Sequence, residues 1–167
     1  MNRPVYIRPL MLDDAMVTYH WRNNPSIWPY SGLRPGKLIT PEHEREWLAS
    51  ILKRENEKRF AICLESNHQL IGCIYLTDIR AKQAVMRIYF GELKYWGAGR
   101  AYRACSLLLE HAFNKLDIEQ IFIEINPNNK AAKQLAKQMG YEKIETIYDG
   151  SKRIILEKMV FNKERYK

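Results

Sequence analysis

The sequence predicts an α/β protein, built as a mixed β-sheet with helices packed on its faces. The order of predicted elements is the first reason: strand, two helices, three strands, helix, strand, helix and two strands. Length is the second, because 167 residues suffice to bury a core without disulfides or metals. Composition is the third, since 46% hydrophobic and 28% charged residues are an ordinary globular balance. We therefore expect a single domain over residues 1–167.

The N-terminal elements are predicted to be one strand, one helix and a long loop. Residues 6–10 read as a short strand, and Asp13 or Asp14 can cap a helix that runs to about Arg22. Residues 23–39 contain three prolines and two glycines, which indicates an irregular loop. Loops of this length often carry function.

A second helix and three strands follow. Thr40 supplies a capping hydroxyl, with proline and an acid directly after it, which is a strong helix start. The β-rich segments 59–65 and 70–76 are separated by a polar turn and read as a hairpin, and residues 84–92 form a third strand.

The C-terminal half alternates helices and strands. Apolar residues recur at helical spacing over 99–116 and again over 129–139, where Gly140 is expected to end the helix in a left-handed cap. The remaining strands are predicted at residues 120–125, 144–148 and 153–161.

Cysteine usage and hydropathy indicate the cellular setting. Cys63, Cys73 and Cys105 are odd in number, have no CxxC spacing and lie in apolar segments. A disulfide between Cys63 and Cys73 on neighbouring strands stays open, but this usage favours a reducing, cytoplasmic setting. The sequence contains no apolar run of membrane-spanning length and no stretch of signal-peptide type. We therefore expect no membrane partner.

The segment Trp96–Ala101 carries the chemistry of the sequence. It joins a predicted strand to a predicted helix, whose first turn has unpaired N–H donors and the positive end of the dipole. Gly97 and Gly99 let the backbone turn tightly and approach a ligand. Arg100 and Arg103 add positive charge that a bound anion would offset. Together these features indicate a phosphate site.

Two other phosphate-binding motifs do not fit this turn. It is not a Walker loop, because no Gly-Lys-Ser/Thr follows. It is not a dinucleotide fingerprint, because Tyr102 stands where the third glycine belongs. From the turn alone, a plain tight β–α connection is equally well supported.

The wider sequence resembles the GNAT superfamily of N-acetyltransferases. Trp96–Ala101 is similar to the family's Arg/Gln-x-x-Gly-x-Gly/Ala motif, with Trp96 in the first place. Residues 129–132 and 139–141 resemble its Asn-x-x-Ala/Ser and Gly-Phe segment, and the openings 7–14 and 21–25 also match. The pattern is that of the branch of ribosomal-protein N-terminal, spermidine and sugar-nucleotide acetyltransferases.

The resemblance implies a single GNAT fold that uses acetyl-CoA as co-substrate and needs no metal. It implies about seven mostly antiparallel strands, with about four helices on the faces of the sheet. It also implies a splayed central pair, here residues 84–92 and 120–126, between which the pantetheine arm inserts. Asn129 is also a reasonable helix cap, and both of its roles stay open. The implied cofactor contacts are Tyr89, Phe90, Gly91, Trp96, Gly97, Ala98, Gly99, Arg100, Ala101 and Asn129.

The catalytic helpers of the family are absent at their usual positions. The tyrosine that many relatives use as acid corresponds to Ala136, a serine used by others to Ala132, and a common glutamate to Val85. Glu92, at the end of its strand, is our candidate base, against the alternative of a surface carboxylate.

Three tyrosines are candidate acids, against the alternative of core or wall aromatics on strands: Tyr89, Tyr141 and Tyr148. His20 and His43, near the long loop, are read as solvent-facing helix residues instead of bases.

The acceptor site of the family lies at the first two helices, their loop and the last hairpin. Trp28 and Tyr30 in that loop can stack on a substrate or pin the loop to the body. The loop carries no carboxylate cluster, which disfavours a polyamine. A net charge of +8 is compatible with a nucleotide-linked amino sugar or an acidic protein surface.

The expected function is therefore acetyl transfer from acetyl-CoA to a primary amine, by direct attack in a ternary complex. The acceptor is expected to be an amino sugar nucleotide, a protein N-terminus or a small amine. The alternative is a degenerate GNAT domain that binds acyl-CoA as a sensor or interaction module. Nucleic acid is disfavoured because aromatic residues do not alternate with lysines as on a single-strand platform. A homodimer is compatible with the sequence, which does not fix the oligomeric state.

Overall fold

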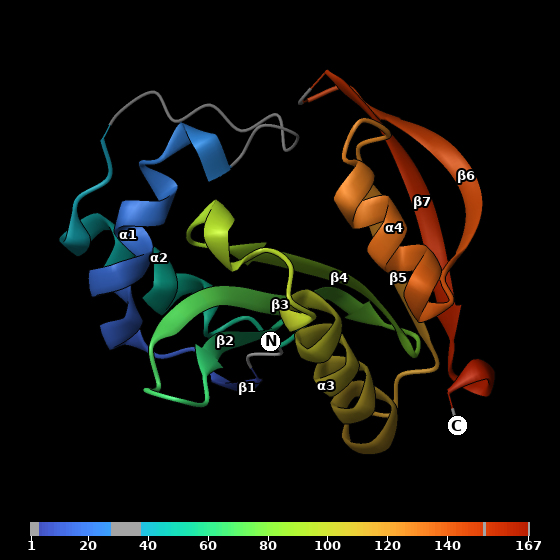
Figure 1. The fold of residues 1–167 in the computed structure, drawn as a ribbon, viewed down its shortest axis with the longest axis horizontal. Helices are drawn as coiled ribbons and strands as arrows, with labels where there is room; N and C mark the ends of the chain where they lie inside the picture. The colour runs from blue at the N-terminus through green and yellow to red at the C-terminus, as the bar shows by residue number, and fades with distance from the viewer. Residues whose placement is uncertain (1–3, 28–37, 152, 167) are drawn as a thin grey trace.

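The computed structural model describes residues 4–27, 38–151 and 153–166. Within these residues seven strands form one sheet in the order β1-β2-β3-β4-β5-β7-β6 (Figure 1). All neighbouring strands are antiparallel except β4 and β5, which are parallel. The strands are β1 (Val5–Pro9), β2 (Lys58–Leu64), β3 (Leu70–Arg80), β4 (Gln83–Phe90), β5 (Gln120–Ile125), β6 (Glu142–Asp149) and β7 (Ile154–Asn162).

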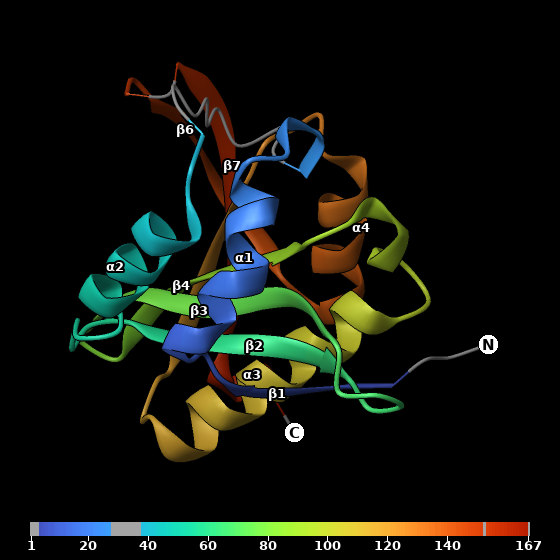
Figure 2. The same ribbon diagram turned by 90° about the vertical axis from the view of Figure 1, so that its left-hand side faces the viewer.

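Helices cover both faces of this sheet, as Figure 2 shows from the side of the first two. The helices of the described residues are α1 (Ala15–Arg22), α2 (Pro41–Ile51), α3 (Arg100–Lys115) and α4 (Lys130–Met139). Residues of β2 divide the core between the two faces, because side chains alternate along a strand. Ala61 and Cys63 pack in a cluster with α1 and α2, whereas Ile62 and Leu64 pack in the cluster that contains α3.

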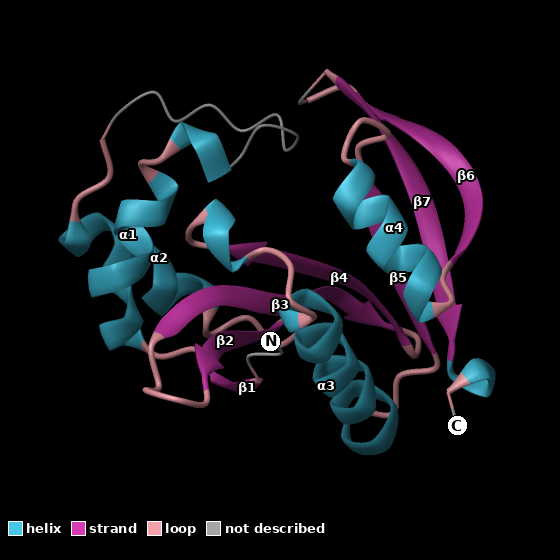
Figure 3. Cartoon of the chain, viewed as in Figure 1, coloured by secondary structure: helices cyan, strands magenta, loops and turns pink. Residues whose placement is uncertain are grey.

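The sheet opens in its middle, where β4 and β5 part. Their pairing covers Gln83–Gln120, Ala84–Ile121 and Val85–Phe122 and then stops. Beyond it β4 continues along β3 to Phe90, while β5 continues along β7 to Ile125. Figure 3 shows the strands diverging into two groups, with α4 beside β5 and β7. The predicted mixed sheet with a splayed central pair is thereby confirmed.

Local signals at helix ends are confirmed as well. The Thr40 hydroxyl accepts from the backbone N–H of His43 at 3.1 Å and caps α2. Gly140 ends α4 with a φ of 101°, in the left-handed region. Asp14 stands at the N-cap of α1 but accepts from the backbone N–H of Met11 and pairs with Arg8 instead of capping the helix.

Some predicted boundaries differ from the structure. β3 extends four residues beyond the predicted end at residue 76, and β4 ends at Phe90, so that Glu92 lies after the strand. All three cysteines are buried free thiols, and no Cys63–Cys73 disulfide forms between β2 and β3. Among the described residues, no helix is long and apolar enough to cross a membrane.

Candidate active site

The turn between β4 and α3 has a backbone suited to binding an anion. Gly97, Ala98 and Gly99 have φ values of 108°, 52° and 74°. No group among the described residues accepts a hydrogen bond from the N–H of Ala101 or Tyr102, in the first turn of α3. A Cβ added at Gly97 would meet nothing within 4 Å, so the turn opens to a ligand. Free donors, the helix dipole and open space fit a phosphate group.

The side chain of Arg100 is buried beside the turn. It is 6% exposed, and its Nη1 donates to the carbonyl of Tyr95 at 3.2 Å. Its Nε has no acceptor among the described residues. Arg100 lines a hollow of about 1130 Å³ together with Trp96 and Ala98 of the turn and with the β2–β3 turn. Its backbone N–H donates to the carbonyl of Gly97 at 3.1 Å.

A cavity of about 830 Å³ lies between the diverging strands. The pairing of β4 with β5 stops at Val85, and β4 continues along β3 to Phe90. An extended ligand with amide groups can bond to the edge of a strand. The cleft runs from Trp96 of the turn to the closed end, where β4 and β5 still pair.

Gly91 was predicted to offer its backbone to the cofactor, and the structure gives it a packing role too. Its N–H donates to the carbonyl of Ile71 at 2.8 Å, which extends the β3–β4 pairing. A Cβ at this position would overlap the indole of Trp21 in α1. The glycine therefore lets α1 approach the end of β4.

Helix α4 forms the opposite wall of the cavity. Asn129 caps it, because its Oδ1 accepts from the N–H of Ala132 at 3.2 Å. The residues that α4 presents to the cavity include Ala132, Leu135 and Ala136. None of these three carries a polar side chain, so this face of the helix offers no acid or base.

Among the described residues, four carboxylates line the cavity: Glu57, Asp78, Glu92 and Glu124. The last two lie at different ends of it. Glu92 lies next to the turn, with a side chain that is 53% exposed and 3.2 Å from Lys94. Glu124 lies on β5, just beyond the last β4–β5 pair, and its side chain is 21% exposed. The nearest charged partner of Glu124 is Arg87 on β4, at 3.8 Å.

The wall on the α2 side is a fixed stack of rings and guanidinium groups. Arg59 lies 4.3 Å from the ring centre of Tyr75 and 5.6 Å from that of Trp47. Glu57 accepts from Arg59 at 2.7 Å and from Arg54 at 2.9 Å. Burial alone would raise the pKa of Glu57, but these hydrogen bonds outweigh it and lower the pKa. Glu57 is thus committed to its arginines.

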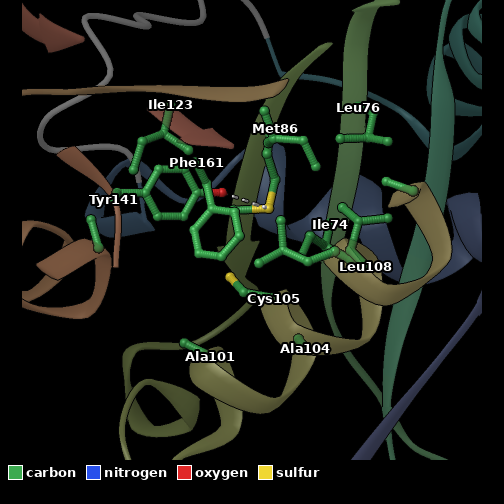
Figure 4. Close-up of a cluster of buried hydrophobic side chains, with 14 of the residues drawn as sticks. Ile74, Leu76, Met86, Ala101, Ala104, Cys105, Leu108, Ile123, Tyr141 and Phe161 are labelled. Carbon is green, nitrogen blue, oxygen red and sulfur yellow. Dashed lines mark hydrogen bonds between the residues drawn. The ribbon is translucent and has the colours of Figure 1, made fainter. Parts of the chain in front are cut away.

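The three tyrosines named from the sequence have different surroundings. Tyr141 is buried, and its hydroxyl donates to Met86 Sδ at 3.9 Å (Figure 4). Burial raises the pKa of Tyr141 well above its usual range. Burial raises the pKa of Tyr89 in the same way, and the neighbouring Cys73 thiol adds to the shift. Tyr148 is 67% exposed on β6.

The remaining predicted residues are surface groups or lie outside the described part of the chain. His20 and His43 are exposed on α1 and α2, in agreement with their bland interpretation. Trp28 and Tyr30 lie outside the described residues. Within the described ranges, no group of three or more His, Cys, Asp or Glu side chains is placed to hold a metal.

Comparison with known proteins decides the family. Residues 5–142 match the model of the acetyltransferase (GNAT) domain. The chain belongs to the GNAT acetyltransferase family. GNAT enzymes take their acyl group from acetyl-CoA.

Individual relatives are distant from this GNAT chain. A probable N-acetyltransferase of Bacillus subtilis is 26% identical over 149 residues, covering 85% of this chain and 82% of its own. The spermidine N(1)-acetyltransferase of Escherichia coli is 22% identical, over 82% of this chain and 72% of its own. A spermidine N-acetyltransferase from Vibrio cholerae, solved with CoA and spermine, has a TM-score of 0.85 at 20% identity, covering 97% of both chains.

Sequence reasoning missed two charged residues of this GNAT cleft, Arg87 and Glu124. A signal for them exists in the sequence. In residues 120–125 the side chain of Glu124 falls on the strand face opposite to Ile123 and Ile125. Its place in the cleft depends on how this strand pairs with residues 83–85. The sequence of neither segment predicts that register, because the two strands are distant in the chain.

Proposed function

We propose that this enzyme transfers the acetyl group of acetyl-CoA to a primary amine by direct attack in a ternary complex. The observation that carries this proposal is continuity. One cavity is lined by Trp96, which directly precedes the glycines of the turn, by β4 from Met86 to Phe90 and by Glu124. Acetyl-CoA supplies the thioester, and the chain supplies binding, orientation and a route for the proton.

We place the cofactor along this cleft, with the pyrophosphate at the turn and the thioester toward the closed end. The backbones of Tyr89, Phe90 and Gly91 then face the pantetheine arm, and Asn129 lies near it as well as capping α4. The contacts proposed at the turn are those of Trp96, Gly97, Ala98, Gly99, Arg100 and Ala101.

An attacking amine must lose a proton, and we propose that a carboxylate accepts it. Glu92 was our candidate from the sequence. In the structure it lies beside the turn and pairs with Lys94, at the pyrophosphate end of the cleft. Glu124 lies where β4 and β5 part, toward which the thioester would extend. We therefore place Glu124 first and keep Glu92 as the alternative.

For the acceptor, we propose a small molecule or peptide with one primary amine instead of a polycation. Two of the similar proteins are spermidine acetyltransferases, which makes spermidine the necessary probe. The sequence from residue 23 to 40 contains no Asp or Glu. On the cleft wall Glu57 is taken up by Arg54 and Arg59.

The other carboxylates of the cavity are mostly paired as well. Glu92 lies near Lys94, and Glu124 lies near Arg87. This leaves Asp78 as the cavity carboxylate with no ion pair among the described residues. A polycation would therefore meet mostly carboxylates that already have a cationic partner.

The test is acetyl-CoA binding by calorimetry, followed by thiol release with a panel of amines. The panel should contain spermidine, an aminoglycoside, glucosamine, a nucleotide-linked amino sugar and a short peptide. We expect binding, and turnover with at least one amine. Absence of acetyl-CoA binding would contradict the proposal. Binding without thiol release for any amine would favour the degenerate, acyl-CoA-sensing alternative.

A further inference from the structure

Tyr141 brings a hydroxyl to the closed end of the cleft. It follows the left-handed cap at Gly140, and its backbone N–H donates to the carbonyl of Ala136 at 2.9 Å. Its ring packs 5.5 Å from that of Phe161, and the side chain is 5% exposed. Figure 4 shows the hydroxyl directed toward Met86 among apolar side chains. These contacts fix the direction of the phenol.

The partner of this hydroxyl is a weak one. It donates to Met86 Sδ at 3.9 Å, and a thioether sulfur is a poor acceptor. Buried tyrosine hydroxyls usually have a stronger partner. Met86 is the first residue of β4 after the last pair with β5, and both Met86 and Tyr141 line the cavity. The proton of Tyr141 therefore points to the place where the strands part.

The leaving group of the reaction needs a proton at this place. A ligand held at the turn and running between the strands has its thioester at the far end of the cleft. When the C–S bond breaks, its electron pair stays on sulfur, and a thiolate in an apolar cavity is costly. Cys105 lines the same cavity, and burial raises the pKa of its thiol to about 12.

The helix wall cannot supply that proton, because it presents Ala132 and Ala136. We propose that Tyr141 is the proton donor to the leaving thiolate. This inference rests on the proposed function. The amine nitrogen forms the new bond to the carbonyl carbon, the C–S bond breaks, and the Tyr141 Oη proton moves to sulfur. Glu124 or Glu92 takes the proton of the amine, and the phenolate regains a proton from water.

The phenol of Tyr141 and the leaving thiol would lie in the same apolar surroundings, which shift both pKa values in the same direction. The burial that raises the pKa of Tyr141 also raises that of a thiol in the cavity. Proton transfer between them therefore does not become steeply unfavourable, as it would if the thiolate were solvated and the phenol buried. Met86 Sδ marks where a sulfur acceptor can lie, since it already accepts from this hydroxyl.

The test is Tyr141→Phe, which removes the hydroxyl and keeps the ring. We expect kcat to fall about tenfold to a thousandfold, within or somewhat below the usual range for a general acid. The KM for acetyl-CoA and the thermal midpoint should change little. A solvent deuterium isotope effect on kcat should weaken in the variant. Tyr6→Phe on β1, outside the cavity, removes a hydroxyl that bonds to His68 Nδ1, and this matched control should behave as wild type.

Rescue distinguishes chemistry from packing. Adding Ala136→Tyr to Tyr141→Phe places a phenol on the helix wall of the same cavity and should restore part of kcat. A kcat for Tyr141→Phe within about twofold of wild type overturns the inference and leaves the proposed function standing. If the wild type releases no thiol with any amine, the proposed function fails and this inference falls with it.

Discussion

Glu92 and Glu124 lie at opposite ends of one cleft, and replacing each by glutamine tests which of them is the general base. Glu→Gln keeps shape and removes the proton-accepting charge. We expect Glu124→Gln to lower kcat about a hundredfold, because the amine then loses its general base. Glu92→Gln should stay within about threefold of wild type. Thiol release at saturating acetyl-CoA measures both. The opposite ranking would return the role to Glu92.

Buried thiols give a second expectation at the residue scale, this time about pH. Burial raises the pKa of Cys73 and of Cys105 to about 12. Thiolates are the reactive form, so both should resist alkylation at pH 8 while the chain is folded. In the unfolded chain thiols ionise near their ordinary pKa, so these two groups make stability fall as pH rises from about 9 toward 12.

The measurement is iodoacetamide labelling followed by mass spectrometry, with and without denaturant. Cys73 and Cys105 should label fully in denaturant and hardly at all without it. Rapid labelling of Cys105 in the native chain would show that the cavity opens to reagents far more than the structure indicates.

Among the elements, the β4–α3 turn makes the sharpest prediction. Gly97 has a φ of 108°, so Gly97→Ala should cost about 1–2 kcal/mol in the free energy of unfolding. Ala98 already holds a left-handed φ of 52°, so Ala98→Gly should relieve strain and gain at most about 1 kcal/mol after the entropy cost of glycine. Urea denaturation of both variants checks the pair. Equal losses would mean that the turn relaxes around either side chain.

The same turn shows which elements a sequence can predict. Thr40, Asn129 and Gly140 act at helix ends within their own segments, and their capping roles were readable from neighbouring residues. The length of β3 was not, because its last residues have register partners across the sheet in β4. Glu124 belongs to the same class: its place in the cleft depends on a pairing between strands 37 residues apart in register, Val85 with Phe122.

For the whole molecule, the division of the sheet predicts that the cofactor is also a stabiliser. Acetyl-CoA would contact both β4 and α4, which lie on opposite walls of the cavity. A ligand that binds only the folded chain at 100 times its Kd adds about 2.7 kcal/mol to the free energy of unfolding. Thermal unfolding should therefore shift upward with CoA. A fragment that lacks pantetheine, such as 3′,5′-ADP, should shift it less, because it cannot bridge the two walls.

At this scale the sequence predicted most of the architecture. The alternation of elements and the family motifs gave the sheet, its helices and the place of the open turn. The catalytic half was less accessible, because Met86 lies on β4, Cys105 on α3 and Tyr141 in the connection between α4 and β6. These three side chains come together only when the core assembles. No local sequence pattern in any one of the three segments predicts that contact.

The end of the β4–β5 pairing at Val85 has a consequence for backbone dynamics. Beyond it, the amide groups of β4 that face β5 receive no carbonyl from that strand. Their hydrogens should exchange with deuterated solvent faster than those of the same strand that bond to β3. A bound pantetheine arm would act as an added strand and slow that exchange. Occupancy of the site can thus be followed amide by amide, even before any acceptor has been found.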